Sequence, residues 1–413
     1  MDALDSGDTA WMLMSTALVL FMTPGLAFFY GGMVRSKNVL GMLMQNLFAM
    51  GALAILWVVI VFSLAFGRAG DGGVLGNLDF AFLRHVGVGM APGAFFGTLA
   101  IPFVLFCAYQ MTFAIITPAL ITGATADRLK FSGYAVFICA WLVLVYGPVA
   151  HWVFGGGFLA RLGALDFAGG TVVHINAGAA ALAVVLVVGV RRRYPQEPMP
   201  PHNLPLTVLG TGILWFGWAG FNAGSALAAN GVAAQAIMNT FLAAPAAMLG
   251  WLLIERVRGG HATTLGAASG AVAGLVAITP CAGFVSGMAP VYIGFTTGVV
   301  CYLALGIKRA FKFDDSLDVV AVHLVGGVLG SVLLGLFADS AVNAAVTHEG
   351  TLLGGGTALL VDQLTATAST LAYSFVVSLL IAKVVAATIG LRVDEGGEDV
   401  GLDLSQHAET AYS

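Results

Sequence analysis

Long apolar segments recur along almost the whole chain of 413 residues, and they constrain its fold more than any other feature. Several reach about twenty residues, the length that an α-helix needs to cross a hydrocarbon core of about 30 Å. Charged residues make up only 9% of the chain, whereas soluble domains carry roughly 25%. The period-2 alternation of a membrane β-barrel is absent from the sequence. The chain is therefore predicted to be an all-α polytopic membrane protein.

Eleven apolar segments are candidate transmembrane helices. They cover residues 10–32, 40–66, 94–123, 133–153, 171–190, 206–225, 233–254, 265–283, 287–306, 319–337 and 357–390. A faint internal similarity relates Ala27–Asn38, at the end of the first segment, to Ala219–Asn230, at the end of the sixth. Because these stretches would lie on opposite sides of the membrane, we expect two inverted five-helix halves plus a long last helix.

The basic residues predict the orientation of the chain. Thirteen of its seventeen Lys and Arg residues follow odd-numbered segments, three follow even-numbered segments, and Lys383 lies within the last one. By the positive-inside rule, the N-terminus is expected outside and the C-terminus in the cytoplasm. Residues 1–390 would then form the transmembrane domain and residues 391–413 a cytoplasmic tail.

Two histidines lie inside otherwise apolar segments. They are His174, in GALDFAGGTVVHINAGAA, and His323, in DVVAVHLVGGVLG. Ionisable groups at membrane depth are costly and usually functional. The fifth and tenth segments, which carry them, correspond in the two halves, so we expect the rings to meet at the centre and line a path. Burial disfavours the imidazolium, so each neutral ring offers one donor and one acceptor to a small polar molecule.

A metal site or an enzyme is the rival interpretation of these histidines. No carboxylate or cysteine accompanies them at the same depth, whereas zinc takes about four ligands, or three and a water. General acid–base catalysis lacks a companion group for the same reason. We therefore expect no cofactor, no bound metal and no enzymatic activity.

Asp166 precedes the helix that is expected to begin near Gly170, and it has two interpretations. As a cap, its carboxylate would accept hydrogen bonds from free backbone amides. As a functional group, its negative field would attract a cation to the outer mouth.

Aromatic residues gather near the predicted outer ends of the segments and within the third. Trp152 and Phe154 precede a triple glycine, and the candidate substrate-binding residues are Phe154, Ser225, Phe113, Phe221, Trp218 and Tyr109. Most membrane aromatics are interfacial anchors or core filling. Ring faces nevertheless attract cations by about 0.5–2 kcal/mol, and a serine hydroxyl accepts a hydrogen bond from an ammonium-type ligand. Such terms hold a cation at the mouth but do not offset an ideal Born cost of about 20 kcal/mol in the core.

Several motifs closely resemble those of the ammonium transporter family (Amt/Mep/Rh), in its microbial Amt branch. They are FMTPGLAFFYGGMVRSKNVL, GALDFAGGTVVHINAG, PHNLP, GFNAGSA, DVVAVHLVGG and the tail GLRVDEGGEDVGLDLSQHAETAY. The resemblance implies a homotrimer of eleven-helix protomers in a bacterial or archaeal cytoplasmic membrane, each protomer with its own pore. It places the family's twin histidines on His174 and His323, its stacked gate phenylalanines on Phe113 and Phe221, its outer-site serine on Ser225 and its structural acid on Asp166.

The function that this resemblance implies is ammonium transport. NH4+ would be recruited at the outer aromatic site, lose a proton, and cross as NH3 past the histidines. Whether the proton returns outward or follows along the histidine pair is left open by the residues. The resemblance also implies that the tail docks on the cytoplasmic loops, where a PII-type regulator would bind. No nucleic acid partner is expected.

One position departs from the family pattern. The family has a tryptophan directly before the triple glycine, and this chain has Phe154 there. A phenyl ring has a weaker negative face than an indole. We therefore expect weaker recruitment of the cation, and an ammonium sensor or a low-flux transporter is the alternative function.

Overall fold

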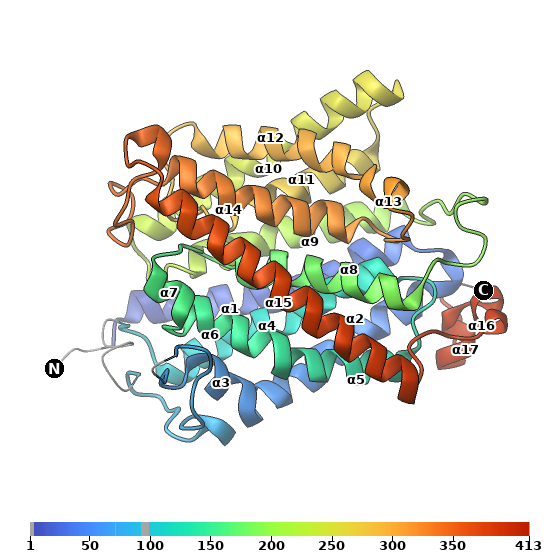
Figure 1. Ribbon diagram of the computed structural model, residues 1–413, viewed down its shortest axis with the longest axis horizontal. Helices are drawn as coiled ribbons and strands as arrows, with labels where there is room; N and C mark the ends of the chain where they lie inside the picture. The colour runs from blue at the N-terminus through green and yellow to red at the C-terminus, as the bar shows by residue number, and fades with distance from the viewer. Residues whose placement is uncertain (1–3, 71, 92–98, 413) are drawn as a thin grey trace.

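The computed structural model describes residues 4–70, 72–91 and 99–412, and these residues form a bundle of helices. The described residues contain two isolated β-bridges and no strand. Most helices run close to the long axis of the molecule (Figure 1). The prediction of an all-α polytopic fold is confirmed.

Ten helical runs in the described residues are long and apolar enough to cross a membrane. The first five contain α1 (Ser6–Met33), η1 (Ser36–Asn38), α2 (Val39–Leu56), η2 (Trp57–Val61), α3 (Phe62–Phe66), α4 (Phe103–Thr125), α5 (Phe131–Trp141), η4 (Leu142–Tyr146), α6 (Gly147–Phe154), α7 (Phe158–Leu162), η5 (Gly170–Ile175) and α8 (Asn176–Val188). The other five contain α9 (Leu204–Trp218), η6 (Ala219–Ala223), α10 (Gly231–Gly259), α12 (Ala289–Ala304), α13 (Ile307–Ala310), η7 (Val320–Val325), α14 (Gly326–Phe337) and α15 (Ala358–Thr388).

A shorter helix occupies the place of the eighth expected crossing. It is α11 (Thr264–Ile278), which has 15 residues and contacts α10, α12 and α14. The count of eleven crossings depends on this helix and stays a prediction.

The third crossing begins later than its hydropathy indicated. Helix α4 starts at Phe103 instead of residue 94; residues 94–98 lie outside the described residues, and residues 99–102 are not helical. Pro102 is the N-cap residue of α4 in an extended conformation. Pro disfavours helical backbone at the residue before it, here Ile101, and α4 begins directly after Pro102.

Five of the helical runs contain a π-helical turn, in which the backbone is wider than in an α-helix. Such turns are rare and often mark functional sites. Turn η5 contains His174, η6 contains Phe221 and η7 contains His323. Three of the residues expected at the site therefore lie on irregular backbone.

The two histidine-bearing segments, η5–α8 and η7–α14, run in opposite directions through the centre of the bundle. Segment η5 follows α7 at one end of the molecule, and η7 follows α13 at the other (Figure 1). Their close approach requires glycine: a Cβ on Gly178 would lie 2.5 Å from the backbone nitrogen of Leu324, and one on Gly327 would lie 3.1 Å from the Cβ of His174. Small residues thus allow the two histidine-bearing segments to touch, as in other membrane helix pairs.

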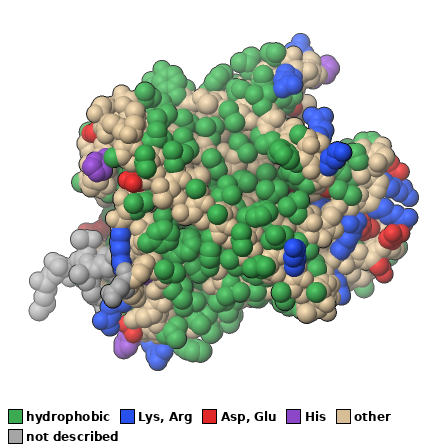
Figure 2. Space-filling model, in the orientation of Figure 1, with side chains coloured by type: hydrophobic (Ala, Val, Ile, Leu, Met, Phe, Trp, Pro, Cys, Tyr) green, Lys and Arg blue, Asp and Glu red, His purple; other side chains and the backbone are tan. Residues whose placement is uncertain are grey.

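The surface divides into an apolar belt and two charged ends. Figure 2 shows hydrophobic side chains over the middle of one face, with Lys, Arg, Asp and Glu mostly at the ends. The tail helices α16 (Glu395–Val400) and α17 (Leu402–His407) lie at the α13 end. This distribution matches a protein that crosses a bilayer.

Candidate functional site

A cavity of about 180 Å³ opens at the α7 end of the bundle, opposite the tail. It is lined by Phe66, Leu99, Phe106, Gln110, Phe113, Phe154, Phe167, Ala168, Ser225 and Leu227. Phe154, Gln110 and Ser225 are half-buried, so they are partly accessible from outside. We call this space the outer cavity. It combines several ring faces with two polar side chains, the surroundings that suit a small organic or ammonium-type cation.

The hydroxyl of Ser225 has a backbone partner. It donates to the backbone oxygen of Phe221 at 2.8 Å, so its lone pairs remain available as acceptors. Tyr109 is fully buried behind it, and its hydroxyl lies 2.9 Å from the Gly220 oxygen and 3.2 Å from Ser225 Oγ. Tyr109 therefore supports Ser225 and the η6 turn and does not line the outer cavity.

Phe113 and Phe221 lie at the inner end of the outer cavity. Their ring centroids are 4.5 Å apart and the rings are tilted by 54°, so they are in contact but are not stacked in parallel as the family resemblance implied. Both side chains are buried. Phe113 lines the outer cavity, while Phe221 lines a second, deeper one. The two rings therefore separate the two spaces.

The deeper cavity contains both histidines. It has a volume of about 10 Å³, close to the space that a single water-sized molecule needs. The Nδ1 atoms of His174 and His323 are 3.2 Å apart, and the ring of His174 is 6.0 Å from that of Phe221. One imidazole donates to the other, so a single proton lies between the two Nδ1 atoms. Among the described residues, the buried Nε2 of His174 has no hydrogen-bond partner.

The two tryptophans that were grouped with the mouth lie elsewhere. Trp218 lines the deeper cavity, its ring 5.7 Å from that of His174, and its indole N–H donates to Thr279. The ring of Trp152 packs on Tyr373, and its N–H donates to the Val74 oxygen. Trp152 is not among the residues that line the outer cavity and does not replace an indole at position 154.

Asp166 binds the head of the His174 segment. Its two carboxylate oxygens accept four backbone N–H groups, those of Gly169, Gly170, Thr171 and Val172, at 2.7–3.1 Å. Burial raises the pKa of Asp166 above its ordinary value, although the four hydrogen bonds oppose this shift. The carboxylate therefore satisfies every free amide of the first turn, as a capping residue does.

Comparison with known proteins now decides the family. A family model described as Ammonium Transporter Family matches residues 10–412. The chain belongs to this family of ammonium transporters. Its members are transporters and not enzymes.

Similar proteins cover almost the entire chain. The ammonium transporter of Mycobacterium tuberculosis is 51% identical over 99% of this chain and 90% of its own length. A crystal structure of Candida albicans Mep2 superposes with a TM-score of 0.89 and 37% identity, covering 99% of this chain and 91% of that one. A structure described as a sensor Amt protein gives a TM-score of 0.88 and 28% identity, covering 97% of this chain and 98% of that one.

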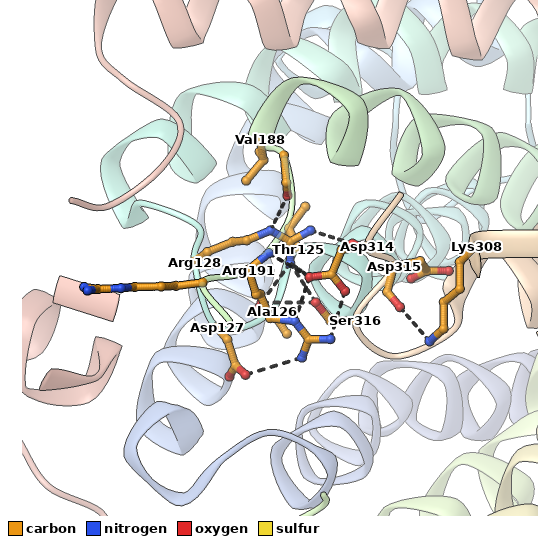
Figure 3. A network of polar contacts seen from close by, with 12 residues as sticks. Thr125, Ala126, Asp127, Arg128, Val188, Arg191, Lys308, Asp314, Asp315 and Ser316 are labelled. Carbon is orange, nitrogen blue, oxygen red and sulfur yellow. Dashed lines mark hydrogen bonds and ion pairs between the residues drawn. The ribbon is translucent and has the colours of Figure 1, made fainter. Parts of the chain in front are cut away.

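In this ammonium transporter family member, a buried ionic cluster lies at the tail end of the bundle (Figure 3). The fully buried guanidinium of Arg128 donates to the backbone oxygens of Gly189 and Asp314 and to the Ser316 hydroxyl at 2.6–2.8 Å. Arg191 binds both carboxylate oxygens of Asp314 at 2.8–2.9 Å. Burial lowers the pKa of Arg128 to about 10. Burial alone would raise the pKa of Asp314, but its contacts with the two arginines hold it below its ordinary value. The cluster joins the ends of α4 and α8 to the loop before η7.

Two polar residues of the site were missed from the sequence. Asp315 accepts the N–H groups of Val319 and Val320 at the head of η7, and it precedes His323 by eight residues, as Asp166 precedes His174. This repeated spacing of eight residues could have identified Asp315 as a second capping residue. Gln110, in the outer cavity, lies one helical turn before Phe113.

The tail contacts loops at the same end as the ionic cluster. Glu398 is buried and binds Arg392 and the backbone of Arg192. Asp403 accepts the N–H of Gly41 at 2.8 Å, and the Leu402 N–H donates to Asn38. The tail thus contacts η1, the start of α2 and the loop after α8.

Proposed function

We propose that this family member transports ammonium by holding NH4+ in the outer cavity, releasing one proton and conducting NH3 past His174 and His323. The observation that carries the proposal is the contact of the two imidazoles inside a cavity of about 10 Å³, immediately beyond two phenylalanine rings. Membership of the ammonium transporter family supports ammonium as the substrate. The outer cavity, which opens at one end of the bundle, supports entry of the cation from that end.

In the outer cavity, Phe154, Phe113 and Ser225 supply the terms that bind a cation. Each ring face contributes about 0.5–1 kcal/mol at a partly exposed site. The Ser225 hydroxyl accepts an N–H because its own proton is used by Phe221. Gln110 adds an amide oxygen. A hydrated ammonium ion fits the chemistry of this cavity.

Past the phenylalanines, only a neutral molecule is accepted. The deeper cavity is lined by apolar side chains, the two imidazoles and Trp218, and transfer of an ion there costs of order 20 kcal/mol in the ideal limit. NH4+ avoids this cost by releasing a proton. Potassium, which has a similar size, has no proton to release. The free Nε2 of His174 offers NH3 one of the hydrogen bonds that it loses with water.

Proteoliposomes containing the chain test this function. An ammonium pulse is expected to give a response above that of protein-free liposomes, either a transient current if the proton follows or an interior alkalinisation if it stays outside. Potassium at the same concentration is expected to give none. Equal responses to both ions would contradict the proposal.

Phe154 favours a second candidate function, that of an ammonium sensor with little flux. The phenyl ring stands where the family has an indole, and the fold is equally close to that of a protein described as a sensor. Binding of ammonium without flux above the background of protein-free liposomes would select this alternative.

Replacing Phe154 with tryptophan is expected to lower the half-saturating ammonium concentration. An indole exceeds a phenyl by about 0.5–1 kcal/mol in binding a cation, which corresponds to roughly two- to fivefold. The measurement is the concentration dependence of the response. Trp152→Phe is the matched control, because the reverse exchange takes place at a ring that does not line the outer cavity. An unchanged half-saturation in Phe154→Trp would remove Phe154 from the binding site.

We further propose a homotrimer in a bacterial or archaeal cytoplasmic membrane, with the N-terminus outside and the tail in the cytoplasm. The concentration of arginine and lysine at the tail end supports this orientation. A PII-type regulator would bind at the same end, beside the tail contacts of Arg192 and Lys37.

A further inference from the structure

Helix α15 carries a row of buried polar side chains on one face. They are Gln363, Thr367, Thr370, Ser374 and Ser378, at most 7% exposed and spaced by three or four residues. This spacing places them on the side of the helix that packs on α8 and α14 (Figure 1). Polar groups in a membrane helix are energetically costly unless they are paired. The hydrogen-bond partners of this row therefore indicate what the row does.

Gln363 binds the backbone directly before Asp166. Its Oε1 accepts the N–H of Leu165 at 2.7 Å, and its Nε2 donates to the Leu165 oxygen at 2.8 Å. The same Nε2 is 3.1 Å from the hydroxyl of Ser331 on α14. One amide therefore joins the loop that caps the His174 segment to the helix that follows His323.

Ser374 binds the other end of the His174 turn. Its hydroxyl donates to the backbone oxygen of Asn176 at 2.7 Å, two residues after His174 and at the junction of η5 with α8. Gln363 and Ser374 are eleven residues apart, which is about three turns of helix. They therefore hold the π-helical turn at its head and at its end from one rigid helix.

We propose that Gln363 and Ser374 are positioning residues that set the orientation of His174 toward His323. The inference rests on the proposed function of the histidine pair. The two Nδ1 atoms are 3.2 Å apart, at the long end of the hydrogen-bond range. A shift of the η5 turn by a fraction of an ångström would break this contact. A π-helical turn is a local departure from the α-helix, and Gln363 and Ser374 bind the backbone on either side of this one.

The test compares Gln363→Leu, Gln363→Glu and Ser374→Ala with Thr365→Ala in proteoliposomes. Thr365 is the matched control because it is exposed on the same helix and its hydroxyl donates only to Val361 of that helix. Gln363→Leu is expected to reduce the maximal ammonium response about tenfold, as misplacement of reacting groups does, and to weaken discrimination against potassium. The half-saturating concentration should not change, because the outer cavity is not touched. Gln363→Glu, which keeps an acceptor for the Leu165 N–H, should be intermediate.

Two results would overturn the inference. One is a Gln363→Leu protein with unchanged maximal response and ion discrimination. The other is a loss in both Gln363→Leu and Ser374→Ala that only follows the amount of folded protein, measured by gel filtration and thermal melting. A protein that lacks both imidazoles is the reference: if it retains discrimination, the proposed function itself fails, and if it alone loses discrimination, only the positioning role fails.

Discussion

Replacing His174 and His323 together with leucine is expected to reduce the ammonium response of proteoliposomes by at least about fivefold. Leucine fills a similar volume but offers no hydrogen bond to NH3 in a cavity that is otherwise lined mainly by apolar side chains. An unmade hydrogen bond in a buried site costs about 1–3 kcal/mol, which is roughly 5- to 150-fold in rate. The response is measured as current and interior pH after an ammonium pulse.

The control for this double exchange is His261→Leu combined with His348→Leu, which removes two exposed imidazoles outside the pore. That protein is expected to behave like the unmodified chain. If the His174/His323 variant kept both its response and its discrimination against potassium, the imidazoles would have no role in conduction.

Replacing Asp166 with alanine is expected to produce the largest loss of stability. Four buried N–H groups lose their acceptor, and each costs about 1–3 kcal/mol when left unpaired. Even with partial relaxation of the turn, the folded state should lose about 4 kcal/mol or more. Thermal melting of the detergent-solubilised protein measures the effect.

Asp166→Asn separates capping from charge. The asparagine keeps one acceptor oxygen, so we expect about half the loss in stability. If the alanine protein melted at the temperature of the unmodified chain, the four hydrogen bonds would not stabilise the pore segment. If the asparagine protein were stable but bound ammonium more weakly, the negative field of Asp166 would have the functional role as well.

The helical fold was predictable from the length of the apolar segments. The histidine pair was predictable because a lone polar residue in an apolar segment is a strong signal. The meeting of His174 and His323 was expected because the fifth and tenth segments, which carry them, correspond in the two inverted halves. The start of α4 was not predictable from hydropathy, because residues 99–101 are as apolar as the helix itself and only Pro102 marks its beginning.

The positions of the tryptophans show what local spacing alone misses. Residues two apart on a helix point about 200° from each other, so Trp152 and Phe154 face different partners although they are near neighbours in the chain. Trp218 precedes Ser225 by seven residues, or about two turns, and lies beside His174 instead of the mouth. The row on α15 has a visible spacing, but its partners, Leu165 and Asn176, are almost two hundred residues away.

The contact between η5 and η7 forms late in biosynthesis, because the two turns lie far apart in the chain. His174 and His323 are 149 residues apart in the chain, so at a synthesis rate of about 5–20 residues per second roughly 10–30 s pass between their emergence from the ribosome. During that interval the first imidazole is in the bilayer without its counterpart. A nascent chain released before η7 is made would lack one of the two imidazoles that meet in the deeper cavity.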